Sequence, residues 1–241
     1  SGDGRRVERP CRAGPGPRER GGVLIGRVGE QATLRAALDD AAGGVVRTVL
    51  LVGEPGIGKT ALLDDALATA AGRSTVRLGA VEMERGMPGA AMSLLAAALP
   101  HLVRELPAAS RVAFADAAGG VMDDRAPAAF LRLLSALAGS GPAVLAADDM
   151  QWWDRPTRLA LAFALRRLAD VPFTALLAGR SECRTDPALA GLPQLEVLPL
   201  ADDDAIGVLQ LTAPAMPTAV ARSLLPALAG NPLALVQTAG A

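Results

Sequence analysis

From Leu24 onwards, short continuous apolar runs alternate with longer segments in which apolar residues recur every three or four positions. A run in which almost every position is apolar is typical of a parallel strand that helices cover on both faces. The runs predict five strands, at 48–52, 75–78, 143–147, 173–178 and 195–198. Their alternation with helical segments predicts an α/β fold, in which a five-stranded parallel sheet lies between helices.

The segments between and around these runs have helical periodicity. In the first of them, 30–42, Leu34 and Leu38 are spaced to lie on one face of a helix. The others are 60–71, 90–99, 108–118, 126–137 and 157–168. After Pro199 the pattern is wholly helical, with helices expected at 202–211 and 218–229 and a last one from Pro232. We therefore expect an α/β domain at 23–200 and the start of a truncated helical lid subdomain at 201–241.

Residues 1–22 do not share this pattern. They are rich in Gly, Pro and Arg, and such a segment cannot bury enough apolar surface to offset its ordering entropy, so we expect a disordered tail. A basic arm that binds nucleic acid is the alternative interpretation. Asp3, Glu8 and Glu19 dilute the positive charge of the segment and weaken that interpretation.

Composition and charge exclude several classes of function. The net charge of −1 gives no overall basic field, so we expect no direct contact with DNA or with an anionic membrane. His101 is the only histidine, which argues against a Ser/His/Asp triad or a histidine-based metal site. Cys11 and Cys183 lack metal-ligand spacing and are expected to be free thiols. No apolar run reaches the ~18 residues of a membrane span, and no signal peptide is visible, so we expect a cytoplasmic protein.

The sequence Gly-Glu-Pro-Gly-Ile-Gly-Lys-Thr at 53–60 matches the phosphate-binding loop pattern G-x-x-x-x-G-K-[ST]. It follows a predicted strand and precedes a predicted helix, which is the context that this loop requires. Its glycines let backbone N–H groups turn towards an anion at a helix N-terminus. Lys59, the only lysine of the chain, is expected to reach the phosphates, and Thr60 to bind Mg²⁺. The expected nucleotide contacts are Gly53, Glu54, Pro55, Gly56, Ile57, Gly58, Lys59, Thr60 and Ala61.

Two adjacent acids end the third predicted strand, where a phosphate-binding loop requires a carboxylate on the metal side. Asp148 is expected to hold Mg²⁺ through water, and Asp149 to polarise the attacking water. Asp149 and Lys59 are therefore the candidate catalytic residues. Aspartate is shorter than the glutamate that is usual at the second position, so the water is expected to be held less well. The alternative is a strand that ends in a solvated acidic turn.

Other candidates carry weaker signals. Arg180, after the fourth predicted strand, is placed for a γ-phosphate sensor or is an ordinary surface arginine. Arg27, just before the first helix, is expected to lie on the adenine side. Pro232 follows Gly230-Asn231 and favours a helix start. Trp152 and Trp153 lie in the segment 150–154 that follows the acidic pair and are candidate core or interface anchors.

Together these motifs resemble the nucleotide-binding domain of STAND-class P-loop ATPases, and more closely the N-terminal module of LuxR-type large ATP-binding transcriptional regulators. The resemblance rests on 25–27 with Glu30, 53–63, 148–157, 176–180 and 230–235, in that order. It implies that one strand separates the phosphate-loop strand from the Asp148 strand, and that Pro232 senses the nucleotide. It also implies an ATP/ADP-dependent switch with Mg²⁺ and slow hydrolysis of ATP.

The chain departs from those regulators in several ways. It contains no helix-turn-helix pattern and no repeat array, so we expect a fragment or a short relative whose partners are such missing parts or a second copy. Met150 and Trp153 stand where the family more often has small residues. An AAA+-like mechanical ATPase is the runner-up interpretation, and it would need a basic groove. A small-molecule kinase would need an arginine-rich lid, whereas 202–204 is acidic. These comparisons favour the regulatory switch.

Overall fold

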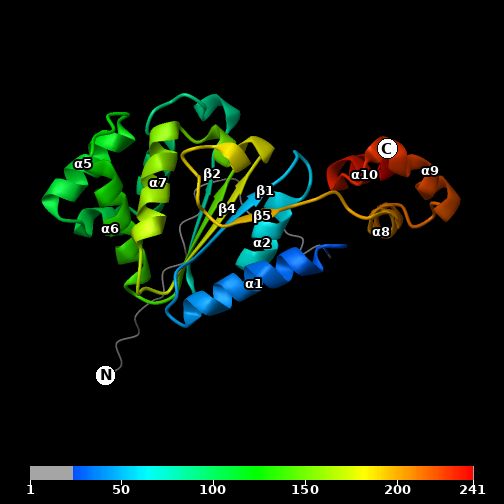
Figure 1. The fold of residues 1–241 in the computed structure, drawn as a ribbon, viewed down its shortest axis with the longest axis horizontal. Coiled ribbons are helices and arrows are strands. Elements are labelled where there is room, and N and C mark those ends of the chain that lie inside the picture. The colour runs from blue at the N-terminus through cyan, green and yellow to red at the C-terminus, as the bar shows by residue number, and fades with distance from the viewer. Residues whose placement is uncertain (1–23, 241) are drawn as a thin grey trace, which may run out of the picture.

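A computed structural model describes residues 24–240 (Figure 1). A central sheet carries helices on both faces, and a separate group of helices follows it at the C-terminal end of the chain. The tail expected at 1–22 lies outside the described residues. None of the helices in the part that is described is both long and apolar enough to cross a membrane.

The five strands form one parallel sheet in the order β2-β3-β4-β1-β5. This confirms the expected five-stranded parallel sheet, and β4 separates β1 from β3 as the family resemblance implied. The carboxyl ends of β1, β3 and β4 therefore lie at one edge of the sheet, and the loops that follow them meet there. The strands are β1 (Arg47–Val52), β2 (Ser74–Gly79), β3 (Ala143–Asp148), β4 (Phe173–Gly179) and β5 (Gln194–Glu196).

Two hydrophobic clusters cover the two faces of the sheet. Leu50 and Val52 of β1 belong to one cluster, and Val49 and Leu51 belong to the other, because successive side chains of a strand point to opposite faces. Every residue of β3 and β4 is buried, which explains why their sequences show no polar alternation. The smaller cluster includes α1 (Val28–Ala42) and α2 (Lys59–Thr69). The larger one includes α3 (Ala90–Ala98), α5 (Ala108–Ala118), α6 (Ala126–Ala138) and α7 (Arg155–Arg167).

One helix was missed by the sequence analysis. The segment expected to end at Leu99 is followed at once by α4 (Pro100–Glu105). Leu99 leaves the helical conformation, with φ −128° and ψ 49°, and Pro100 begins a new helix at its first position. Proline is well tolerated there, because the first N–H of a helix has no partner within the helix.

The C-terminal helices have a small core of their own. They are α8 (Asp202–Thr212), α9 (Thr218–Leu228) and α10 (Pro232–Ala239), close to the expected bounds. Their core is formed by Leu200, Ala205, Ile206, Leu209, Ala221 and Leu235. Figure 1 places α10 nearest to the loop between β1 and α2. Within residues 24–240, the other elements are short 3₁₀ helices after β2, β3 and β4: η1 (Glu82–Glu84), η2 (Met150–Trp152) and η3 (Ser181–Thr185).

Candidate functional site

The loop between β1 and α2 has the backbone of an anion-binding loop. Gly56 and Gly58 have φ of 77° and 103°, in the left-handed region that favours glycine. Gly58 is also the N-cap of α2, and no side chain caps the first N–H groups of that helix. These N–H groups, together with the positive end of the helix dipole, are available to an anion.

The Lys59 ammonium lies against the same loop. Its Nζ donates to the backbone oxygens of Gly53 at 2.8 Å and Glu54 at 2.9 Å. Burial lowers the pKa of Lys59, while the carboxylates of Asp148 and Asp149 act in the opposite direction. The single lysine of the chain therefore brings its positive charge to the point where the loop, the α2 N-terminus and the end of β3 meet.

Asp148 and Thr60 are brought together from two different elements. Asp148 is the last residue of β3 and is buried, and the Thr60 side chain of α2 lies beside its carboxylate, where it favours the ionised form. The pKa of Asp148 is raised, first by burial and then by the negative charge of Asp149. Nη2 of Arg77 lies 3.6 Å from Asp148 Oδ2 and partly balances the charge. A hydroxyl and a carboxylate are the kind of oxygen ligands that Mg²⁺ takes.

This pair would supply only part of a metal's coordination shell. Within residues 24–240, no group of three or more His, Cys, Asp or Glu side chains is arranged to hold a metal ion. Mg²⁺ usually keeps several waters and binds through one or two protein groups plus the phosphates of a substrate. The donors present therefore fit a metal that arrives with a phosphorylated ligand better than a resident structural metal.

Asp149 adopts an unusual backbone conformation at the start of η2. Its φ of 54° and ψ of 45° are left-handed, which is uncommon for a residue with a side chain. Its N–H donates to Asp148 Oδ1 at 3.0 Å. Its own carboxylate accepts a 2.7 Å hydrogen bond from Nε2 of Gln151. The two acids thus face different partners, although they are neighbours in the sequence.

Arg180 is half-buried just beyond β4. Its guanidinium carbon lies 4.6 Å from the centroid of the Trp152 ring, and that of Arg85 lies 5.6 Å from the same ring. Trp152 and Trp153 are both buried, and Nε1 of Trp153 donates to the backbone oxygen of Asp148 at 3.2 Å. Both tryptophans belong to the larger hydrophobic cluster, so of the two interpretations the core role is the one they have here.

Arg27 makes its hydrogen bonds with the protein. The guanidinium is buried and donates to the backbone oxygens of Ile57 at 2.9 Å and Leu198 at 2.8 Å. Nη1 also pairs with the Glu30 carboxylate at 2.8 Å. Arg27 therefore joins the loop between β1 and α2 to the segment that follows β5.

The start of α10 contacts the loop directly. Asn231 Nδ2 donates to the backbone oxygen of Pro55 at 2.9 Å, and the N–H of Leu233 donates to that of Gly56 at 3.2 Å. Pro232 is the first residue of α10 and lies between these two contacts. The distant Gly230–Leu233 turn is thus brought to the loop. Glu54 of the loop in turn accepts a 2.6 Å hydrogen bond from Ser181, whereas Ile57 is buried.

Sequence reasoning assigned no role to Gln151, Asn231, Ser181 or Arg77. The signal for Gln151 was a polar residue between Met150 and Trp152, two positions after the acidic pair, and Arg77 was a lone charge inside an apolar strand. Asn231 appeared only as part of a helix start. Ser181 had no signal of its own, because its partner Glu54 is 127 positions away.

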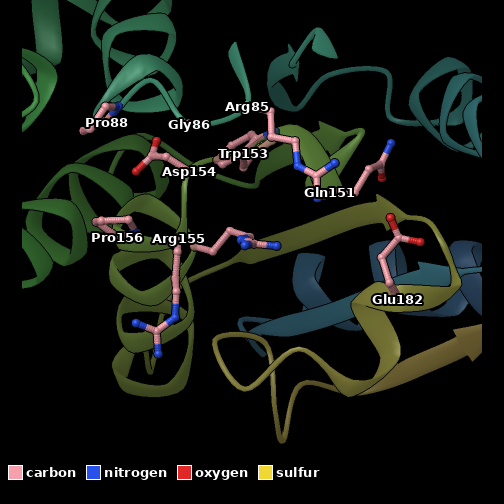
Figure 2. Close-up of a pocket in the computed structure, with 10 residues that line it drawn as sticks. Arg85, Gly86, Pro88, Gln151, Trp153, Asp154, Arg155, Pro156 and Glu182 are labelled. Carbon is pink, nitrogen blue, oxygen red and sulfur yellow. The ribbon is translucent and has the colours of Figure 1, made fainter. Parts of the chain in front are cut away.

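A separate hollow lies beside this site. It has a volume of about 350 Å³, and its lining includes Arg85, Gln151, Trp153, Asp154 and Glu182 (Figure 2). Lys59, Thr60 and Asp148 do not line it. The geometry that can hold an anion and a divalent cation is therefore in the loop region and not in this hollow. Gln151 lines the hollow and also hydrogen-bonds to Asp149.

Comparison with known proteins agrees with this arrangement. The family model of the AAA ATPase domain matches residues 23–177. No curated protein matches the sequence. Similar solved structures include a RuvB mutant from Thermotoga maritima, with TM-score 0.52 and 18% identity over 90% of this chain and 62% of that one. A DNA replication initiation factor has TM-score 0.50 and 14% identity, over 85% of this chain and 57% of that one.

A third similar structure is a Signal Transduction ATPase with Numerous Domains (STAND) protein with a tetratricopeptide repeat sensor, from Pyrococcus horikoshii. It has TM-score 0.48 and 18% identity, over 83% of this chain and 28% of that one. The chain thus spans less than two thirds of the length of each of these structures. Because the family model covers well over half of the sequence, the chain belongs to the AAA ATPase domain family.

Proposed function

We propose that this chain binds ATP with Mg²⁺, hydrolyses it slowly to ADP and phosphate, and acts as a nucleotide-dependent regulatory switch. The observation that carries the proposal is the convergence of Lys59, Thr60 and Asp148 at the uncapped N-terminus of α2. A cation, a hydroxyl and a carboxylate on a glycine-rich loop are the set that phosphoryl chemistry requires.

Each residue has a distinct role in this proposal. The backbone N–H groups of 53–61 and the Lys59 ammonium hold the phosphates, and Thr60 and Asp148 hold the metal. Mg²⁺, when bound, neutralises charge that develops on the phosphate oxygens. Asp149 orients the water that attacks the terminal phosphorus, while Arg180 senses the terminal phosphate. Arg27 acts indirectly, by bracing the loop at Ile57.

The contact between α10 and the loop supports a switch. Asn231 and Leu233 hydrogen-bond to the oxygens of Pro55 and Gly56, so a change in the loop reaches the C-terminal helices through two direct bonds. We propose that the chain is a STAND-class module of a LuxR-type transcriptional regulator, as the sequence resemblance implied. Its partners would then be ATP and ADP, a helical-repeat sensor, a helix-turn-helix part and possible further copies of the chain.

A thermal-shift measurement tests nucleotide binding. Mg-ATP is expected to raise the melting temperature of the parent chain by several degrees, because a ligand that binds only the folded state stabilises it. EDTA should remove most of that gain. Lys59→Ala should lose it, whereas Thr69→Ala, at the far end of the same helix, should keep it. An equal gain in Lys59→Ala would contradict the assignment of the loop.

The identity of the bound nucleotide and the rate of turnover distinguish a regulatory switch from an ATP-driven mechanical enzyme. The purified chain is denatured, the released nucleotide is identified by chromatography, and single-turnover hydrolysis of Mg-ATP is followed on refolded or exchanged protein. Retained ADP and turnover of minutes or slower are expected for a switch. An empty site with turnover of about one per second or faster, within the usual range for ATP-driven enzymes, would replace the switch with a mechanical ATPase.

A further inference from the structure

Gln151 is a buried amide with two specific partners, one directly after β3 and one directly after β4. Its exposed fraction is 7%. Nε2 donates to Asp149 Oδ1 at 2.7 Å, and Oε1 accepts from the backbone N–H of Arg180 at 3.0 Å. Both ends of the amide are therefore used, and they join the acid after β3 to the residue after β4.

The residue after Arg180 extends this connection to the phosphate-type loop. The Ser181 hydroxyl donates to Glu54 Oε1 at 2.6 Å. In the sheet, β3 lies next to β4 and β4 lies next to β1. Hydrogen bonds thus run along the carboxyl edge of three adjacent strands, from Asp149 through Gln151 to the end of β4 and on to the loop after β1.

Asp149 needs such support for two physical reasons. Its side chain is one methylene shorter than glutamate, so it has less reach to adjust its position to a water. Its backbone is in the left-handed region, and this conformation persists only where surrounding structure fixes it. Gln151 bonds to Oδ1, which sets the rotation of the carboxylate and leaves Oδ2 unblocked by Gln151.

We infer that Gln151 is a positioning residue for hydrolysis, which holds the Asp149 carboxylate in register with the end of β4 and the phosphate-type loop. The inference rests on the proposed function, because it needs Asp149 to orient the attacking water. Gln151 itself exchanges no proton and touches no phosphate. Its effect is to keep a reacting group in place, and a misplacement of ~1 Å can cost about a hundredfold in rate.

Two substitutions separate the two ends of the amide. Gln151→Met has a similar volume and removes both hydrogen bonds, whereas Gln151→Glu keeps an acceptor for the Arg180 N–H and removes the donor to Asp149. Met150→Leu, a volume-conserving change at a buried neighbour in the same 3₁₀ helix, is the control. Folding of each variant is checked by thermal melting before kinetics.

Single-turnover hydrolysis of Mg-ATP and binding of a fluorescent ATP analogue are then measured for each variant. Gln151→Met and Gln151→Glu should slow hydrolysis by about tenfold to a hundredfold and change nucleotide affinity by less than about threefold, while Met150→Leu changes neither. In the Asp149→Asn background, Gln151→Met should cause no further loss of rate, because it acts through Asp149.

The outcomes separate this inference from the proposed function. A parent chain that neither binds nor hydrolyses ATP would overturn both. A parent chain that is active, with Gln151 variants equally active, would overturn only the positioning role. Equal losses of affinity and rate, or an additional loss in the Asp149→Asn background, would also overturn it, because they would show a general structural role.

Discussion

At the scale of single residues, the negative charge of one buried carboxylate in the site lowers the stability of the folded protein. Burial and the neighbouring Asp149 raise the pKa of Asp148, so the ionised carboxylate destabilises the fold near neutral pH. We predict that Asp148→Asn is more stable than the parent chain in the absence of metal and nucleotide. The same variant should lose the part of the Mg-ATP stabilisation that depends on Mg²⁺, because it lacks the ionised metal ligand.

The pH dependence gives this prediction a sign that can be checked. The pKa of Asp148 is higher in the folded protein than its ordinary value of 3.8. The free energy of unfolding therefore rises as the pH falls through the folded-state pKa towards that ordinary value. The advantage of Asp148→Asn should therefore be largest near pH 7 and shrink on acidification. Melting temperatures of both proteins between pH 7 and pH 4 measure it, and an advantage that grows on acidification would contradict it.

We predict that the Cys183 thiol is unreactive in the folded protein. It is buried, and desolvation, with a smaller contribution from nearby carboxylates, raises its pKa to about 11. At pH 8 only about one thiol in a thousand is then ionised, and only the thiolate reacts. In a Cys11→Ser chain, a disulfide reagent should label Cys183 slowly in buffer and rapidly in urea. Rapid labelling of the native protein would show that the η3 segment opens readily.

At the scale of elements, α7 begins with a cap that can be tested alone. Asp154 has extended backbone, and its Oδ1 accepts from the N–H of Thr157 at 2.9 Å. We predict that Asp154→Ala lowers the free energy of unfolding by about 1 kcal/mol, measured by urea denaturation. Asp154→Asn should lose less or nothing, because it keeps the acceptor and removes charge from Oδ2, which is buried without a hydrogen-bond partner. Equal losses in both variants would show that the cap is not the cause.

Most elements were predictable from the sequence because their local signals agree with their burial. The strands β3 and β4 are covered on both faces, so a continuous apolar run identifies them. The boundary between α3 and α4 was not predictable in the same way. A proline after an apolar helix is read as its end, and only the backbone angles of Leu99 show that a second helix starts there.

The candidate site was predictable as far as it depends on local sequence. Lys59, Thr60 and Asp148 lie in two short motifs, and their meeting follows from the parallel sheet. The supporting contacts were not predictable, because they join distant positions. Gln151 reaches the end of β4, and Arg27 reaches Ile57 and Leu198, which are 30 and 171 positions away. Nothing in the neighbouring sequence of these residues specifies such partners.

At the scale of the whole molecule, the C-terminal helices are attached to the sheet domain at the loop itself. The N–H of Leu200 donates to the oxygen of Gly230 at 2.9 Å. This bond joins the segment that follows the sheet to the turn that precedes α10. Gly230 has φ of 64°, and a Cβ there would lie 2.4 Å from the Leu200 oxygen. Glycine is therefore required where the chain turns to bring Asn231 to the loop.

Asn231 combines two roles that one substitution can separate. Its Oδ1 caps α10 by accepting from the N–H groups of Leu233 and Ala234, and its Nδ2 donates to the oxygen of Pro55. Asn231→Asp keeps the cap but replaces the donor with a carboxylate that repels the Pro55 oxygen. We predict that it loosens the contact between α10 and the loop without unfolding α10, whereas Asn231→Ala loses both roles.

Hydrogen exchange measures this difference at particular amides. The N–H of Leu233 is shared between the Gly56 oxygen and Asn231 Oδ1, so its protection reports both the contact with the loop and the cap. The N–H of Leu235, which donates to the Asn231 backbone oxygen within α10, reports the helix. In Asn231→Asp, protection should fall partly at Leu233, which keeps its bond to the cap, and persist at Leu235. In Asn231→Ala it should fall at both. Unchanged protection of Leu233 in Asn231→Asp would mean that the Asn231 amide does not hold α10 to the loop.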